Sequence, residues 1–402
     1  MPLGDVYSPG MSAAETAIEV KPNALARLGE YLSARGAGGA RVVLITDEVV
    51  GGHYGGAALS ALRGGGFAAE QFRIAPGEVS KSLAITETVY RFLAGQRFGR
   101  DGVIVALGGG VVSDLAGFVA GTWMRGVRWI VCPTTLEAQI DASIGGKTAV
   151  NVPGGKNLVG VFHPPMLVVV DPNCLATLPR RELVAGLAES VKHALITSEE
   201  FFAWHEQNVE KILALDSAVM TLLIERNIAT KTAIVARDPQ ELTGERFVLN
   251  FGHTVGHAIE ECSLNPTTAD TAVAHGPHSG PLPRREGNAP SPLTPLPRGE
   301  GERFRHGECV AIGMVVACRL SHRRGMLDAV VVTRVESLLS RFGLPTRVPE
   351  GMDVKQLLQV MQLDKKARGG KVKFVLLEGI GKPVVVGDVT TADVQAALGG
   401  SG

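Results

Sequence analysis

Short apolar runs alternate with helical patterns in the first half of the chain. Four of these runs are continuous and rich in β-branched residues, at positions 41–47, 101–107, 128–133 and 166–171. Continuous apolar strands separated by helices are typical of a parallel sheet that is covered on both faces. The pattern therefore predicts an α/β unit with a Rossmann-like parallel sheet. Ligands of such sheets bind at the carboxyl ends of the strands, where Asp47, the glycines at 108–110, Thr134 and Thr135 fall.

The pattern changes to helical periodicity from about Thr177 onward. Apolar positions recur at helical spacing in five segments, at 180–196, 200–215, 217–236, 307–325 and 327–342. We place the boundary near residues 172–178. The sequence therefore predicts an α/β domain over residues 1–175 and a mainly α-helical domain over residues 176–402.

Residues 266–301 interrupt the helical pattern. Eight of these 36 residues are proline and five are glycine, a content above the level typical of low-complexity segments. No hydrophobic period is present, so we expect an inserted, disordered surface loop. We do not count its two histidines, His275 and His278, among the candidate ligands.

Charge and cysteine content narrow the function classes. The 402 residues carry 40 Lys plus Arg and 40 Asp plus Glu, so we expect no nucleic-acid or membrane partner. An anionic ligand must then be held by a local group of cations. The five cysteines show no C-x-x-C spacing, and the chain has neither a signal-peptide pattern nor an apolar run that spans a bilayer. We predict a cytoplasmic protein.

A glycine cluster follows the strand predicted at 101–107. Gly108–Gly110 lead into a helical stretch, which suits a phosphate held at a helix amino terminus. The dinucleotide fingerprint is not met, because Ser113 takes the third glycine position and Arg128 stands where an acid is expected. A tight turn before a helix is the alternative interpretation.

Several cations lie in loops or in apolar surroundings. Lys147 and Lys156 each follow two glycines, and a lysine in such a loop can act as a point charge for a phosphate or carboxylate. Any one of the cations is compatible with an ordinary surface position. Together these cations favour an anionic substrate. Besides Lys147 and Lys156, the set contains Arg125, Lys192, Lys231 and Arg246.

Two histidines, His253 and His257, stand four residues apart in a segment with helical pattern. Positions i and i+4 share one helix face, so these imidazoles form either a metal-binding pair or one ligand beside an acid/base group. A catalytic zinc commonly takes three protein ligands; His306 and the acid Glu189 are further candidates. Glu189 could instead pair with Lys192, three residues on. The zinc-protease motif is not met, because Thr254 occupies the place of its general base.

Eight motifs occur together in the order found in the 3-dehydroquinate synthase family. The resemblance runs from about residue 40 to 390 and excludes 266–301. The motifs are Gly-Gly-Gly-Val-Val-Ser-Asp (108–114), Pro-Thr-Thr-Leu (133–136), Asp-Ala-Ser-Ile-Gly-Gly-Lys-Thr-Ala-Val-Asn (141–151), Gly-Lys-Asn (155–157), Gly-Leu-Ala-Glu-Ser-Val-Lys (186–192), Leu-Asn-Phe-Gly-His-Thr-Val-Gly-His-Ala (249–258), His-Gly-Glu (306–308) and Asp-Lys-Lys (364–366).

The resemblance implies an enzyme of the shikimate pathway with NAD on the α/β domain and zinc or cobalt on the helical domain. It would convert 3-deoxy-D-arabino-heptulosonate 7-phosphate, an anionic sugar-acid phosphate, to 3-dehydroquinate and phosphate. NAD would oxidise C5 transiently, phosphate would leave by β-elimination, and reduction, ring opening and an aldol closure would follow. The family also implies a homodimer.

The same resemblance assigns roles to individual residues. Glu189, His253 and His306 would bind the metal, and His257 would act beside them without ligating it. The substrate would be held by Asp141, Lys147, Asn157, Lys192, Lys231, Arg246, Asn250, one of Lys365 and Lys366, and Arg125 of the neighbouring subunit. NAD would contact Asp47, Glu78, Lys81, Gly109, Gly110, Val111, Val112, Ser113, Asp114, Thr134, Thr135, Lys147, Lys156, Cys174, Leu175, Ala176 and Thr177.

The sequence departs from the family pattern at three places. Ser113 stands where the family has glycine, and residues 78–81 are a loose version of its NAD loop. His253 and His306 are 53 residues apart because the 266–301 segment falls between them. Three alternatives therefore stay open. They are a sister cyclase such as a 2-epi-5-epi-valiolone or 2-deoxy-scyllo-inosose synthase, a metal-dependent polyol dehydrogenase, and a non-catalytic binding protein whose metal site the insertion has broken.

Overall fold

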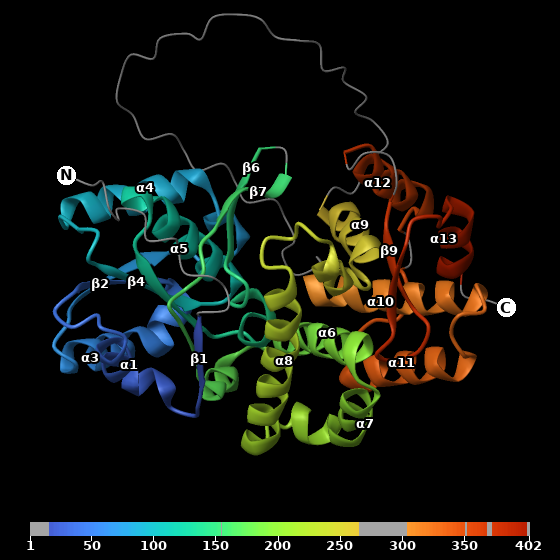
Figure 1. Cartoon of the computed structure of the whole chain (residues 1–402), viewed down its shortest axis with the longest axis horizontal. Helices are drawn as coiled ribbons and strands as arrows, with labels where there is room; N and C mark the ends of the chain where they lie inside the picture. Colours follow the sequence, from blue (N-terminus) through green and yellow to red (C-terminus); the bar gives the residue numbers. More distant parts are fainter. Residues whose placement is uncertain (1–15, 154, 265–303, 350–351, 368–371, 400–402) are drawn as a thin grey trace, which may run out of the picture.

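The computed structural model describes residues 16–153, 155–264, 304–349, 352–367 and 372–399. A sheet with its helices lies on the left of Figure 1 and a helical part lies on the right. The segment predicted as an insertion, 266–301, lies outside the described residues. No described helix has the length and apolar character needed to cross a membrane.

The amino-terminal part contains the predicted parallel sheet. Its six strands lie in the order β1-β8-β5-β4-β2-β3, and every pair is parallel. The strands are β1 (Ala17–Val20), β2 (Arg41–Asp47), β3 (Ala68–Ile74), β4 (Val103–Gly108), β5 (Arg128–Pro133) and β8 (Leu167–Val170). From β2 the chain continues to β3 on one side and then crosses back over β2 to β4 on the other side. In sheets of this kind ligands bind where the direction changes, which is here at the carboxyl ends of β2 and β4.

Helices cover both faces of this sheet, which explains why its inner strands are apolar throughout. Along β2, Val43 and Ile45 belong to one buried cluster, whereas Val42 and Leu44 belong to another on the opposite face. Successive side chains of a strand point to opposite faces, so both must be apolar when both faces are buried. The covering helices are α1 (Leu28–Ala34), α2 (Glu48–Val50), α3 (Gly56–Gly64), α4 (Leu83–Gly95) and α5 (Gly110–Thr122).

An antiparallel hairpin, β6 (Lys147–Val152) with β7 (Gly155–Phe162), stands apart from the sheet and packs against α5. In Figure 1 it rises between the sheet and the helical part. Short helical turns connect the elements around it: η4 (Glu78–Ser80), η5 (Trp123–Arg125), η6 (Ala138–Ala142) and η7 (Pro172–Thr177).

The carboxy-terminal part is mainly helical, as predicted. Its elements are α6 (Arg180–Thr197), α7 (Glu199–Leu213), α8 (Ser217–Arg237), η8 (Glu245–Asn250), α9 (His253–Leu264), α10 (His306–Arg323), α11 (Ala329–Phe342), α12 (Val354–Ala367), a hairpin of β9 (Phe374–Leu377) and β10 (Pro383–Val386), and α13 (Thr391–Leu398). One buried cluster includes Ile45 of the sheet and Phe202 of α7. The helical part therefore shares a core with one face of the sheet.

Two glycines allow the central helix α10 to approach its neighbours closely. A Cβ atom at Gly307 would lie 1.9 Å from the carbonyl oxygen of Ala185 on α6. A Cβ atom at Gly313 would lie 1.9 Å from the carbonyl oxygen of Gly252, just before α9. Any larger residue would force the helices apart, because real Cβ atoms do not approach other atoms this closely. The first residue of α10, His306, is thereby held beside α6 and α9.

Candidate metal and substrate site

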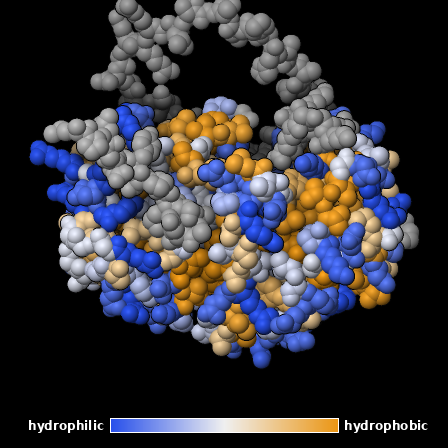
Figure 2. Space-filling view, in the orientation of Figure 1, coloured by the Kyte–Doolittle hydropathy of each residue, from blue (hydrophilic) through white to orange (hydrophobic). Residues whose placement is uncertain are grey.

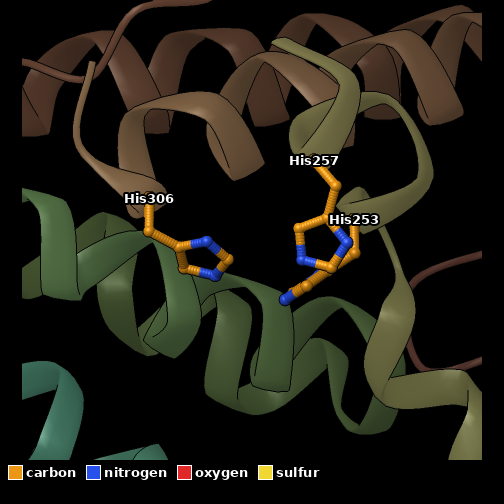
Figure 3. Close-up of side chains that lie close together, drawn as sticks. All are labelled: His253, His257 and His306. Carbon is orange, nitrogen blue, oxygen red and sulfur yellow. The ribbon is translucent and has the colours of Figure 1, made fainter. Parts of the chain in front are cut away.

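Three histidines from two helices face one another above α6 (Figure 3). His253 and His257 come from α9 and His306 from the start of α10, and ring nitrogens of all three lie within 4.8 Å of one another. The ring centroids are 5.3 Å apart for His253 and His306. From α6, the Oε1 atom of Glu189 lies 3.5 Å from Nε2 of His253 and 3.7 Å from Nε2 of His306. The residues separated by the 266–301 segment thus meet.

These distances fit a divalent metal. Zinc bonds to nitrogen and oxygen are about 2.0–2.2 Å long, so ligand atoms of a tetrahedral site lie roughly 3.4 Å from each other. The Oε1 atom of Glu189 is buried and forms no hydrogen bond, and a buried carboxylate oxygen without a partner is costly unless a cation binds it. The arrangement of Glu189, His253 and His306 therefore suits metal binding. His257 is exposed beside them, 5.2 Å from His253 between ring centroids.

The other oxygen of Glu189 is paired with a lysine. Lys192 donates to Oε2, and both side chains are 2% exposed. The ion pair that the i,i+3 spacing allows is therefore present together with the histidine contacts. Burial alone would raise the pKa of Glu189, but the charge of Lys192 outweighs burial and lowers it. The carboxylate is thus ionised and can bind a cation.

The two histidines nearest Glu189 differ in their electrostatics. Burial, with Lys192 nearby, lowers the pKa of His253 to about 3, so its imidazole is neutral and can bind a metal. Burial also opposes the charged form of His306, but a hydrogen bond with Glu260 and the surrounding carboxylates outweigh it. The pKa of His306 is therefore raised to about 9. The carboxylates around His306 thus favour a charged imidazole, and a metal at Nε2 would take the place of its proton there.

A second buried group surrounds Asp141, which lies in η6. Lys231 Nζ donates to the Asp141 carbonyl oxygen at 2.7 Å and lies 2.7 Å from Oδ1. The Nε2 atom of His193 lies 3.3 Å from the same Oδ1. Burial opposes ionisation of Asp141, but Lys231 and Lys192 together hold its pKa well below the usual range. Two ammonium groups thus lie beside a fixed carboxylate next to the metal-binding residues.

A third group contains Lys147 and Arg246. Lys147 donates to Glu241, and Arg246 Nε lies 3.3 Å from the same Oε1 atom. Arg246 is buried, and its Nη1 donates to the carbonyl of Pro239. Burial lowers the pKa of Arg246, and that of Lys231 for the same reason. Lys147 and Arg246 share the carboxylate of Glu241, so an anion could replace Glu241 between them.

The remaining predicted substrate residues are less closely grouped. Asn250 is half-buried at the end of η8, three residues before His253. Asn157 lies in β7 with a left-handed backbone (φ 57°), and its amide donates to Asn151. Arg125 is exposed in the turn after α5. Lys365 and Lys366 fall in α12, and their side chains lie outside the described part of the structure.

The predicted NAD residues lie around the carboxyl ends of the strands. Asp47 ends β2 and caps α2, its Oδ1 accepting from the amides of residues 49 and 50 at 2.9 Å. Gly109 precedes α5, and a Cβ atom there would lie 2.8 Å from Thr135. Gly110 opens α5, followed by Val111, Val112 and Ser113; Thr134 follows β5; and Cys174, Leu175, Ala176 and Thr177 form η7.

This region has a glycine-lined cradle and an unsatisfied polar atom. The Ser113 hydroxyl is buried without a hydrogen-bond partner. Lys81 pairs with Asp114, while Glu78 accepts a hydrogen bond from Asn151 on β6 at 2.7 Å. Close backbone approach and a helix amino terminus are what a pyrophosphate requires, so these residues fit a dinucleotide. Lys156 is placed elsewhere: its Nζ lies 2.6 Å from Oε1 of Glu260 on α9.

Sequence reasoning missed four polar residues of the site. His193 contacts Asp141, and Glu241 joins Lys147 to Arg246. Burial raises the pKa of Glu137, and the nearby charges of His306 and Glu189 also affect it. Glu260 contacts His306. Only Glu260 had a clear signal in the sequence, because it lies seven residues after His253 and three after His257, on the same helix face.

Family models and known relatives match this chain over most of its length. The model described as 3-dehydroquinate synthase N-terminal matches residues 71–185, and the model described as 3-dehydroquinate synthase C-terminal matches residues 186–278 and 298–367. A 3-dehydroquinate synthase of Symbiobacterium thermophilum is 42% identical over 89% of this chain and 90% of its own. One of Xanthomonas campestris pv. campestris is 43% identical over 95% of this chain and 94% of its own.

Solved structures of related cyclases share the fold. A 2-epi-5-epi-valiolone synthase of Streptomyces hygroscopicus, with NAD+ and Zn2+ bound, is 25% identical and superposes with a TM-score of 0.80, covering 99% of this chain and 98% of its own. A 2-deoxy-scyllo-inosose synthase superposes with a TM-score of 0.76 at 24% identity, over 95% of both chains. The family models match most of the chain, and the synthases of Symbiobacterium thermophilum and Xanthomonas campestris are 42% and 43% identical to it. The chain therefore belongs to the 3-dehydroquinate synthase family.

Proposed function

We propose that this protein converts 3-deoxy-D-arabino-heptulosonate 7-phosphate to 3-dehydroquinate and phosphate. The observation that carries the proposal is the meeting of Glu189, His253 and His306 beside a buried group of cations, in a chain that belongs to this family. The substrate has a carboxylate and a phosphate. Lys192, Lys231 and Arg246 offer charges to such an anion in a protein whose net charge is zero.

Glu189, His253 and His306 would hold a divalent metal, zinc or cobalt. When bound, such an ion supplies Lewis-acid polarisation of the substrate C5 oxygen and orients the substrate. Lys192 holds the second oxygen of Glu189, which fixes the direction of the first. Low exposure of Glu189 and Lys192 excludes water from this side of the site, so their charges act in a medium of low dielectric constant.

His257 would move the proton of the C5 hydroxyl. It lies one helical turn after His253 and is exposed beside the metal-binding residues. A histidine that is not a metal ligand can accept and return a proton near neutral pH. This assignment gives the two histidines at i and i+4 different tasks, one binding metal and the other transferring a proton.

The strand ends would hold NAD, which accepts the C5 hydride and returns it, so that no net oxidation occurs. Gly109 and Gly110 allow backbone approach to the pyrophosphate at the start of α5. Asp47 at the end of β2 would bind a ribose hydroxyl, and Lys81 with Asp114 would border the nicotinamide side. The β6–β7 hairpin and η6 connect this region to Asp141 and Lys147.

We also propose a homodimer in which Arg125 reaches the site of the neighbouring subunit. Arg125 is exposed in η5, next to Met124, which is 46% exposed. Apolar side chains of β7 are also exposed, Leu158 at 66% and Phe162 at 51%, and Figure 2 shows apolar surface at the position of this hairpin. Exposed apolar side chains grouped in this way are typical of protein interfaces.

The five cysteines are all buried and unpaired, which supports the cytoplasmic location expected from the sequence.

Substrate choice tests the proposal against a sister cyclase, whose substrate has no carboxylate. The protein with NAD and zinc should release phosphate from the heptulosonate 7-phosphate and not from sedoheptulose 7-phosphate. Turnover of sedoheptulose 7-phosphate alone would assign the chain to a sister activity. A polyol dehydrogenase would instead accumulate NADH in proportion to the substrate consumed.

A further inference from the structure

We infer that Glu260 is a positioning residue that fixes the ring orientation and the tautomer of His306, a proposed metal ligand. The Oε2 atom of Glu260 lies 3.1 Å from Nδ1 of His306, and its Oε1 atom lies 2.6 Å from Nζ of Lys156. The inference rests on the metal site of the proposed function. Glu260 is not a ligand in that site and would act only through the imidazole.

The position of Glu260 follows from the helix that carries it. His253, His257 and Glu260 occupy positions i, i+4 and i+7 of α9, so all three lie on the face toward α10 and the β6–β7 hairpin. The Glu260 side chain is 19% exposed. A carboxylate with so little exposure is costly unless it is paired and hydrogen-bonded. Both of its oxygens have such partners, one from α10 and one from β7.

The contact determines which nitrogen of His306 carries a proton. An ionised carboxylate only accepts hydrogen bonds, so Nδ1 must be the donor. In a neutral imidazole the lone pair is then on Nε2. That atom faces Oε1 of Glu189 at 3.7 Å, on the side where the metal would bind. Carboxylates placed in this way orient metal-binding histidines and increase their basicity.

Lys156 holds the other end of the same carboxylate. It belongs to β7 and precedes Asn157, a predicted substrate residue, whereas Glu260 and His306 belong to the helical part. Without Lys156 the carboxylate would have one partner and more rotational freedom. The orientation of a metal ligand therefore depends on a residue of the hairpin. Lys156 is 41% exposed, so we expect its contribution to be small.

The test measures metal affinity in four proteins: wild type, Glu260→Gln, Lys156→Met and Glu261→Gln. Glu261 is the exposed neighbour on the same helix and serves as the matched control. Glutamine has nearly the size of glutamate, so Glu260→Gln preserves packing while removing the charge. Zinc affinity is measured by competition with a chromophoric chelator, and the visible absorption of Co2+ reports the geometry of its ligands.

We expect Glu260→Gln to bind zinc roughly 10–100-fold more weakly than wild type and to change the Co2+ spectrum. Lys156→Met should lose no more than about fivefold, and Glu261→Gln should match wild type. Saturating zinc should restore most of the activity of Glu260→Gln. Far-UV circular dichroism of the metal-free proteins should be the same, which separates positioning from folding.

Wild-type zinc affinity and an unchanged Co2+ spectrum in Glu260→Gln would overturn the inference, as would an equal loss in Glu261→Gln. Failure of the proposed function gives a different result. A wild-type protein that binds zinc but releases no phosphate would contradict the proposed reaction, and the affinity comparison would still decide the role of Glu260. A wild-type protein without zinc binding would overturn both.

Discussion

The Oε1 atom of Glu189 on α6 lies 3.5 Å from the Nε2 atom of His253 on α9, and no hydrogen bond satisfies that oxygen. Two side chains from distant parts of the sequence thus present a carboxylate oxygen and a neutral imidazole nitrogen to one point. An ionised carboxylate and a neutral imidazole are both metal ligands. Glu189 and His253 therefore form the centre of the candidate metal site.

The two histidines of α9 should differ when each is replaced by alanine. His253→Ala should lose metal and activity together, with metal affinity weakened by more than about 100-fold, because losing a ligand exceeds the effect of losing an outer contact. His257→Ala should keep its metal and lose about 10²–10⁴-fold in kcat, the usual contribution of general acid–base catalysis. Metal analysis and a phosphate-release assay measure both. Full metal occupancy in His253→Ala would refute the ligand assignment.

A methyl group at Gly145 should disturb the nearby guanidinium. A Cβ atom there would lie 2.6 Å from Nη2 of Arg246, and Gly145 has a φ of +103°. Gly145→Ala should raise KM more than it lowers kcat, because Arg246 is expected to bind substrate, and should cost about 1–3 kcal/mol of stability through backbone strain. Steady-state kinetics and thermal unfolding measure these effects.

Gly38→Ala is the matched control, because a Cβ atom at Gly38 meets nothing within 4 Å and its φ is not positive. This variant should behave like wild type. An unchanged KM in Gly145→Ala would show that Arg246 either moves freely or does not bind substrate.

A buried histidine should make stability fall in mild acid. His205 is buried between Ser190 Oγ, which lies 2.7 Å from Nε2, and the carbonyl of Phe201. Burial lowers its pKa from 6.5 to about 4. Between these values the unfolded chain binds a proton that the folded protein refuses, so stability is full above pH 6.5 and is lost as the pH falls toward 4. His205 alone should account for roughly 2 kcal/mol of lost stability between pH 7 and pH 5.

Denaturant unfolding at the two pH values measures this loss. His205→Asn should be less stable at pH 7, because the buried Ser190 hydroxyl loses one of its two hydrogen-bond partners, but its stability should change less between pH 7 and pH 5. The exposed His53→Asn serves as control and should retain the pH dependence of wild type. The same pH dependence in His205→Asn would assign the acid sensitivity to another group.

Replacement of residues 266–301 by a short Gly-Ser linker should leave activity within about twofold of wild type. The described residues on either side already bring His253 and His306 to 5.3 Å between ring centroids, and the free energy of closing a loop depends only weakly on its length. A phosphate-release assay with circular dichroism measures this. An inactive but folded deletion variant would mean that the segment takes part in function.

The sheet could largely be predicted from the sequence. Strands β2 and β5 have the expected bounds, because burial on both faces leaves a continuous apolar run. The edge strand β3 was not predicted, since its burial alternates and polar residues interrupt the pattern. The β6–β7 hairpin was not predicted either, because its glycines and lysines favoured a loop.

The sequence predicted only part of the candidate site. The helical face shared by His253 and His257 follows from their spacing. Their meeting with Glu189 and His306 depends on how α10 packs against α6, which no local pattern encodes. The residues alone made Glu189 and His306 candidates, and the family resemblance implied the ligand set. His193 was not predicted because Asn227 and Asp141 approach it from other elements.

The most direct test of the account is the reaction itself. Wild-type protein with NAD and zinc is given 3-deoxy-D-arabino-heptulosonate 7-phosphate, and phosphate, 3-dehydroquinate and NADH are followed together. The account predicts that phosphate and 3-dehydroquinate form in equal amounts while NADH shows no net increase. Accumulation of NADH in proportion to consumed substrate, or absence of phosphate release from a folded, zinc-loaded protein, would contradict it.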